Sequence, residues 1–227
     1  MDNRILAALP ADELRPLEPH MERVTLELAT PLIVPNETIR WIYFPTTCLA
    51  SLVTVLEDGS TVEAGSVGHE GVVGIPVVLG DESTPMQTLV QIAGEAIRIP
   101  APVLREQLER GLVLRRILYR YIHALFIIAS QSAACNRKHQ VEARLARWLL
   151  MSADGIGSEH VAITHEFLAA MLGVRRPGVT DAALKLQELG LIQYRRASVE
   201  ILDRPRLEDT ACECYRLVAD EYDRIFS

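Results

Sequence analysis

The chain has 227 residues, of which 49% are hydrophobic and 23% are charged, and its formal net charge is −7. This length allows two modest domains with buried cores, and the composition is typical of a globular protein rather than a disordered or fibrous one. The first residues lack a secretory pattern, and charged side chains interrupt the most apolar stretch, residues 112–135. We therefore expect a cytoplasmic protein with no membrane-spanning segment.

The negative charge is unevenly distributed. Residues 1–136 carry a net charge of −6 and residues 207–227 a net charge of −4. Residues 137–206 contain 11 Lys and Arg against 8 Asp and Glu, a net charge of +3. Because affinity for nucleic acid depends on local cations that contact phosphate, the acidic total does not exclude DNA as a partner.

The four cysteines are Cys48, Cys135, Cys212 and Cys214. None belongs to a CxxC pair or lies at zinc-finger spacing from histidines, so we predict no metal site and no cofactor. Small buried thiols are the expected role of such cysteines, and a redox-sensing thiol is the alternative. Nucleophile–base spacings and a P-loop are also missing, which predicts that the chain is not an enzyme.

Residues 11–21 predict a short helical entry, and short alternating segments follow up to about residue 100. The segments with strand-like alternation are residues 24–28, 38–44, 52–56, 61–64, 88–92 and 96–99. Asp58-Gly59 predicts a hairpin between the third and fourth, and Ala93-Gly94-Glu95 predicts a second hairpin between the last two. Short strands at near-regular spacing predict an all-β sandwich or barrel.

A glycine-rich segment, residues 65–74, lies between the predicted hairpins. Its glycines suit tight corners of a β-roll, and a backbone nest for an anion is the alternative interpretation. If this domain binds an effector, the candidate pocket residues are Gly68, Gly71, Gly74, Gln87 and Thr88.

From residue 101 onward the apolar period becomes helical. One stripe follows alternating steps of four and three residues, as in a coiled coil. Its members are Leu114, Leu118, Tyr121, Leu125, Ile128, Ser132 and Cys135. A second apolar stripe on the same helix implies two packing partners, so we predict that the first stripe is a dimer interface. Burial within one chain is the alternative.

Residues 163–202 carry the most specific pattern. Thr164 is suited to an N-cap, Gly173 to the end of the first helix, and Pro177 to the first turn of the second. Two short strands, residues 191–194 and 199–202, then flank Arg195 and Arg196. Helix, glycine turn, helix and a two-stranded wing predict a winged helix-turn-helix that binds double-stranded DNA.

The stretches Leu168–Val174 (LAAMLGV) and Leu186–Ile192 (LQELGLI), with the β-roll and long helix before them, resemble the Crp/Fnr family of bacterial transcription regulators. The resemblance implies a homodimer that binds a two-fold symmetric DNA site and contacts RNA polymerase. It implies base contacts by Arg176 and Thr180. The residues it places mainly at phosphate are Thr164, His165, Arg175, Arg195 and Arg196, and Gly178 and Asp181 complete the predicted interface.

The sequence also departs from this family. Cyclic-nucleotide members hold the phosphate with an arginine in the β-roll, whereas no Lys or Arg occurs from residue 41 to residue 97. Cysteines for an N-terminal iron–sulfur cluster are missing before Cys48. At the recognition helix, Pro177 and Asp181 replace the family's usual Glu and Arg, so we expect a different operator, because aspartate prefers the cytosine amino group. We predict that a cyclic nucleotide is not the effector; a constitutive regulator and a thiol-responsive one remain alternatives.

The predicted fold class is α+β. Residues 1–111 form an N-terminal β-roll (a double-stranded jelly-roll-like sensor domain), residues 112–138 a dimerisation helix, and residues 139–227 a winged helix-turn-helix domain.

Overall fold

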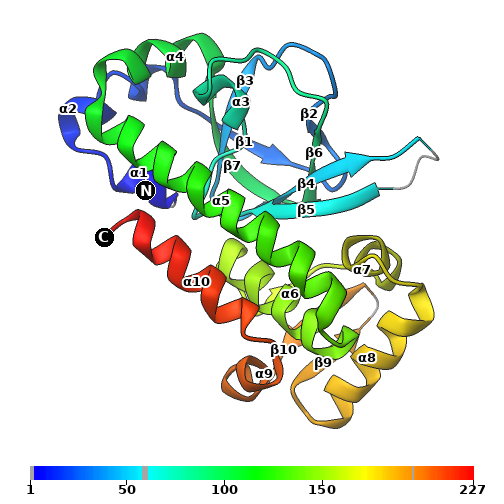
Figure 1. Cartoon of the computed structure of the whole chain (residues 1–227). Helices are drawn as coiled ribbons and strands as arrows, with labels where there is room; N and C mark the ends of the chain where they lie inside the picture. Colours follow the sequence, from blue (N-terminus) through cyan, green and yellow to red (C-terminus); the bar gives the residue numbers. More distant parts are fainter. Residues whose placement is uncertain (1–2, 58–60, 196) are drawn as a thin grey trace.

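The computed structural model describes residues 3–57, 61–195 and 197–227, and places a β-roll at one end of the molecule and a helical domain with a small sheet at the other (Figure 1). The strands are β1 (Glu22–Leu26), β2 (Pro31–Ile33), β3 (Trp41–Pro45), β4 (Leu49–Val55), β5 (Thr61–Val67), β6 (Gln87–Ile92), β7 (Gly94–Pro100), β8 (His160–Val161), β9 (Ile192–Arg195) and β10 (Ser198–Ile201). The helices are α1 (Arg4–Ala7), α2 (Ala11–Leu14), the 3-10 turn η1 (Glu18–His20), α3 (Ile75–Val78), α4 (Ala101–Arg110), α5 (Leu112–Lys138), α6 (Val141–Ile156), α7 (His165–Leu172), α8 (Arg176–Glu188), α9 (Arg204–Thr210) and α10 (Cys214–Ile225).

The β-roll consists of two antiparallel sheets, with strand orders β1-β7-β3 and β2-β6-β4-β5. β4 and β5 pair as predicted, from Ala50 opposite Val67 to Val55 opposite Thr61. The predicted Asp58-Gly59 turn between them lies outside the described residues.

The second predicted hairpin is wrong. β6 pairs with β2 and β4, whereas β7 pairs with β1 and β3 in the other sheet. The reason lies at Gly94, where a Cβ atom would lie 2.6 Å from the backbone nitrogen of Cys48. The chain passes so close to the start of β4 that it crosses between sheets here instead of turning back on β6.

Helix α5 is the longest element and lies against the β-roll over its first half (Figure 1). Its residues Leu114, Leu118 and Tyr121 are completely buried in the same core as Phe44 and Ile99 of the strands. No helix in the described part of the chain is long and apolar enough to cross a membrane.

The C-terminal helix α10 runs beside α5 and returns to the β-roll, so that the two ends of the chain lie close together (Figure 1). Ile225 belongs to the β-roll core, and Arg4 forms an ion pair of 2.9 Å with Asp223 and lies over the ring of Phe226. Residues 222–226 therefore contribute to the core of the β-roll, although they lie beyond the predicted boundary at residue 139.

Candidate nucleic-acid interface

Helices α7 and α8 form the predicted helix-turn-helix. Thr164 caps α7, since its Oγ1 accepts a hydrogen bond of 3.2 Å from the Phe167 amide. Gly173 ends α7 in the left-handed conformation at φ +60°, which glycine adopts without a Cβ clash. Pro177 occupies the first turn of α8, where its missing N–H leaves no helical bond unmade.

The two helices of the motif pack through apolar side chains on their facing sides. Leu168, Ala169 and Leu172 of α7 are buried, and so are Val179, Ala182, Ala183 and Leu186 of α8. Leu189 is 52% exposed, because α8 ends at Glu188 and the chain turns away at Gly190. The buried alanines let the two helices pack closely, which fixes the angle at which α8 leaves the domain.

His165 and Thr180 contact each other rather than projecting separately. The Thr180 hydroxyl lies 3.2 Å from Nδ1 of His165 and 3.1 Å from the carbonyl of Arg176, and the His165 ring stacks on Tyr194 at 4.1 Å between centroids. Nε2 of His165 is buried without a hydrogen-bond partner. Burial, followed by the nearby charge of Arg176, lowers the pKa of His165. Its predicted phosphate contact needs correction, since a neutral ring with a buried Nε2 serves instead to position α8 against the wing.

The exposed part of α8 is its N-terminal turn. Arg175, Arg176, Pro177 and Asp181 are exposed, and Gly178, half-buried, has no heavy atom within 4 Å of the position of a Cβ. The unpaired amides of a helix N-terminus and two adjacent guanidiniums make this turn favourable for phosphate and base edges.

The wing is the pair β9–β10, in register from Arg195 opposite Ser198 to Ile201 opposite Ile192. Arg195 is exposed at the tip, whereas Arg196 lies outside the described residues. Ala197 adopts φ +68°, which places the tight turn where the sequence predicted it. A third strand that the sequence did not indicate, β8, pairs with β10 through Val161 opposite Val199.

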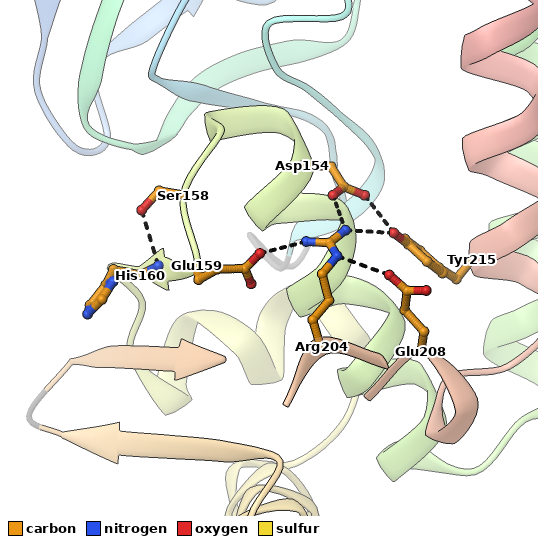
Figure 2. Close-up of polar contacts among 7 residues, drawn as sticks. All are labelled: Asp154, Ser158, Glu159, His160, Arg204, Glu208 and Tyr215. Carbon is orange, nitrogen blue, oxygen red and sulfur yellow. Dashed lines mark hydrogen bonds and ion pairs between the residues drawn. The ribbon is translucent and has the colours of Figure 1, made fainter. Parts of the chain in front are cut away.

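Figure 2 shows the polar network that joins the base of this domain, centred on Arg204 at the start of α9. Its guanidinium pairs with Asp154 at the end of α6, with Glu159 at 2.9 Å and with Glu208 at 3.0 Å. Tyr215 of α10 accepts a hydrogen bond of 2.9 Å from the same guanidinium and donates one of 2.9 Å to Asp154. The half-buried guanidinium of Arg204 thus connects α6, α9 and α10 at the base of the domain.

Comparison with known proteins gives the same assignment. Residues 143–210 match the model of the Crp-like helix-turn-helix domain. The C-terminal part of this chain is therefore a Crp-like helix-turn-helix domain. The sequence resemblance to Crp/Fnr regulators is thus confirmed over residues 143–210.

Solved structures share the fold over most of the chain. FixK2 from Bradyrhizobium japonicum superposes with a TM-score of 0.71 at 14% identity, covering 85% of this chain and 98% of that one. A CRP-family transcriptional regulator from Thermus thermophilus gives 0.63 at 22% identity, with coverage of 84% and 96%. The c-di-GMP responsive regulator CLP from Xanthomonas campestris gives 0.64 at 18% identity, with coverage of 85% and 99%. No curated protein matches by sequence.

The predicted dimer seam needs correction. Leu114, Leu118, Tyr121, Ile128 and Cys135 are 0–1% exposed within a single chain, and Leu125 and Ser132 are half-buried. These residues face the β-roll, α10 and the DNA-binding domain, so they cannot form the contact with a second copy. The alternative interpretation, burial within one chain, holds for this stripe.

A different stripe of α5 is exposed. It has the same alternating steps of four and three residues as the predicted seam, but each position lies two residues earlier in the chain. It comprises Leu112, Arg116, Tyr119, His123, Phe126, Ser130, Ala133 and Arg137. Leu112, Tyr119 and Phe126 are 69%, 53% and 71% exposed, which is unusual for large apolar side chains at regular positions along one helix. Both faces of α5 are apolar, so apolar periodicity alone could not distinguish the stripe that is buried within the chain from the stripe that is exposed. The sequence analysis therefore chose the wrong stripe as the dimer interface.

An apolar cavity of about 430 Å³ lies between the β-roll and α5. Its walls are formed by Leu52, Ala64, Gly65, Gly74, Ile75, Leu79, Met86, Thr88, Leu125, Phe126, Ile128 and neighbouring residues. Gly74 and Thr88 of the predicted pocket line it. Asp81 is the one charged side chain on its described walls, and neither Lys nor Arg is among them.

The other predicted pocket residues lie elsewhere. A Cβ atom on Gly68 would lie 2.3 Å from Cα of Gly155 in α6, and one on Gly71 would lie 2.3 Å from the Tyr121 hydroxyl. Gln87 begins β6, where it pairs with Val53 of β4, and it is not among the residues that line the cavity. Gly68 and Gly71 therefore allow close packing of the β-roll on α6 and α5, as expected for tight corners, rather than forming a nest for an anion.

Proposed function

We propose that this chain acts as a homodimeric, sequence-specific DNA-binding regulator whose β-roll takes an uncharged, mainly apolar effector. The exposed N-terminal turn of α8 supports the DNA-binding part of the proposal. Arg176 is its candidate base reader, while Arg175 and Arg195 are candidate phosphate contacts. RNA polymerase is the partner through which such a regulator would act.

A second copy of the chain is the expected partner of the exposed α5 stripe. Its steps of four and three residues match a parallel two-helix seam, and a two-fold axis along it brings each residue against its own counterpart. Basic Arg116 and His123 separate the apolar positions, so neighbouring acidic groups or water must accommodate them. The same axis would present two copies of α8 to successive turns of the major groove.

The cavity carries the effector proposal. The CLP structure is described as c-di-GMP responsive, and a buried phosphodiester of that kind needs cationic or amide donors. The described walls of this cavity offer no cation and one carboxylate, Asp81, which would repel an anion. Its volume and apolar lining suit a small neutral ligand.

DNA recognition is tested by selecting bound fragments with the purified full-length protein and measuring affinities by fluorescence anisotropy. Arg176→Ala should weaken binding to the selected site by about 1–3 kcal/mol and relax one base position, whereas Arg195→Ala should weaken all sequences alike and reduce the salt slope by about one. Equal losses on selected and random DNA for Arg176→Ala would contradict the proposed orientation of α8.

Effector chemistry is tested by calorimetric titration of cAMP, cGMP and cyclic di-GMP, beside the neutral apolar probe Nile red. We expect uptake of the probe only, abolished by Ala64→Phe, which fills the cavity. Micromolar binding of any cyclic nucleotide would overturn the effector proposal. Failure of the probe to bind, with DNA binding intact, would favour the constitutive alternative.

A further inference from the structure

Four side chains that are far apart in the sequence converge at the junction of α5 with the C-terminal segment. Cys135 and His139 lie one turn apart at the end of α5, and Cys212 and Cys214 lie where the chain enters α10. Their three sulfurs and one imidazole nitrogen all lie within 4.8 Å of one another. The three cysteines are buried, and they form a small core of their own with Ala143.

Distances inside this cluster match the edges of a tetrahedron. Sγ of Cys135 lies 3.5 Å from Sγ of Cys212, and Sγ of Cys214 lies 3.5 Å from Nδ1 of His139. Zinc–sulfur bonds of about 2.3 Å and zinc–nitrogen bonds of about 2.0–2.1 Å give tetrahedral edges of about 3.8 Å and 3.6 Å. The sulfurs are too far apart for a disulfide, whose S–S bond is about 2.05 Å.

Outer groups orient the cluster as they do in metal sites. Nε2 of His139 lies 3.2 Å from a carboxylate oxygen of Glu213, which directs Nδ1 toward the sulfurs. Metal-bound histidines are usually held by a carboxylate in this way. The side-chain amide of Gln131 donates a hydrogen bond of 3.0 Å to Sγ of Cys214, a contact that favours a thiolate.

Two buried arginines supply an independent observation. Arg144 and Arg147 are 6% and 9% exposed, the Nε of each lacks a hydrogen-bond partner, and no carboxylate within the described ranges forms an ion pair with either. Their guanidinium groups donate hydrogen bonds to Asn136 at 2.8 Å and to Ser132 at 3.0 Å, on the last turns of α5 beside Cys135. Buried cations need an anionic partner nearby. One zinc ion with three thiolates and a neutral histidine has a net charge of −1.

We propose that Cys135, His139, Cys212 and Cys214 form a structural Cys₃His site for a single zinc ion. On binding, the three thiols transfer their protons to solvent and the imidazole binds through Nδ1. All four positions have protein ligands, so the site is closed and not catalytic. The ion fastens the C-terminal segment to the end of α5, beside the hinge at Gln140 where α6 begins.

A signal for this site is present in the sequence, but the spacing rules for zinc fingers do not include it. Cys-x₃-His on a helix is an i, i+4 pair on one face, and Cys-x-Cys supplies two further sulfurs. Neither pair indicates a site alone, because only the return of α10 along α5 brings them together.

Metal analysis of the full-length protein, purified with reductant and without chelator, tests the proposal. We expect about one zinc per chain, and cobalt substitution should give the visible d–d bands and near-ultraviolet thiolate charge transfer of tetrahedral coordination. Cys212→Ser and His139→Ala should lower zinc affinity by at least tenfold. The matched control is Cys48→Ser, which removes the cysteine outside the cluster and should keep the full metal content.

A measurement on the unmodified chain covers the case in which a variant does not fold. A mercurial thiol reagent should release the zinc as three cysteines react, while Cys48 stays protected because burial raises the pKa of its thiol to about 12. The proposal is overturned by a chain that contains no zinc and takes up neither zinc nor cobalt. It is overturned equally by a Cys135–Cys212 disulfide as the resting form, or by iron with inorganic sulfide. None of these measurements depends on DNA binding, so failure of the zinc-site proposal can be distinguished from failure of the proposed regulator function.

Discussion

Phe126 offers the sharpest test of the corrected dimer face. An aromatic side chain contributes about 150–250 Å² of buried surface, and Phe126 is 71% exposed in the single chain. A partner that covers the remainder buries about 100–180 Å² per chain, worth about 2.5–4.5 kcal/mol at about 25 cal/mol per Å². Because alanine keeps part of that contact, Phe126→Ala should cost about 2–3 kcal/mol per chain and twice that per symmetric dimer.

Sedimentation equilibrium measures the effect directly. A loss of about 4–6 kcal/mol raises the dimer dissociation constant by about 10³–10⁴-fold. Leu28→Ala is the matched control, since Leu28 is 57% exposed on the β-roll and should leave dimerisation unchanged. Phe126 also lines the effector cavity, so Tyr119→Ala repeats the test at a stripe position outside it.

The buried stripe gives the opposite signature. Leu118 is completely buried in the β-roll core, so Leu118→Ala should lower the free energy of unfolding by about 2–5 kcal/mol without selectively dissociating the folded dimer. If Phe126→Ala and Tyr119→Ala dimerise as tightly as the unmodified chain, the exposed stripe is not the interface and the reasoning from exposure fails.

Three further predictions concern stability. Gly68→Ala should lower the melting temperature by several degrees, because the added Cβ would meet the backbone of Gly155. Gly178→Ala should stabilise the protein by about 0.5–1 kcal/mol, because Gly178 lies in a helix with open space around the position of a Cβ. If differential scanning calorimetry ranks the two variants in the opposite order, the close packing at Gly68 is contradicted. The pKa of His165 is lowered in the folded chain, so the unfolded chain binds protons first and stability should fall as pH drops below about 6.5. His165→Gln should flatten that slope in urea titrations between about pH 7 and 5. Arg204→Ala should lower the free energy of unfolding, measured by chemical denaturation, by about 1–3 kcal/mol. Because salt screens ion pairs, the difference between variant and unmodified chain should be smaller in 1 M salt. A difference that does not change with salt would mean that Arg204 stabilises by packing rather than by charge.

Local signals predicted local structure well. Thr164, Gly173 and Pro177 each act through one or two neighbouring backbone groups, so their roles as helix cap, terminator and first-turn residue could be derived without knowing the fold. The long helix and the wing follow for the same reason. The confirmed Crp-like domain rests on these signals, since their order along the chain is itself the motif.

Predictions that needed tertiary information failed or were incomplete. Gly94 suggested a hairpin, but which sheet receives β7 depends on the close approach to Cys48. Gly68 and Gly71 suggested a ligand-binding loop because such loops are often rich in glycine. In the structure, Gly155 and Tyr121 instead pack directly against these two glycines. Which face of α5 is buried within the chain depends on where α10 packs against it. The sequence of residues 214–225 does not indicate that α10 packs along α5.

Strand β5 connects the cavity to the DNA-binding domain. Ala64 and Gly65 line the cavity, and the preceding residue, Glu63, accepts a hydrogen bond of 3.3 Å from the indole of Trp148 in α6. Removal from water raises the pKa of Glu63, and Ser51 and Gln91 hold its other oxygen at 2.6 and 2.8 Å. A ligand that moves β5 must therefore strain this carboxylate cluster or carry α6 with it. Since a ligand shifts an equilibrium only through its different affinities for the two states, we expect an effector in the proposed cavity to act on α6 through the Glu63–Trp148 contact.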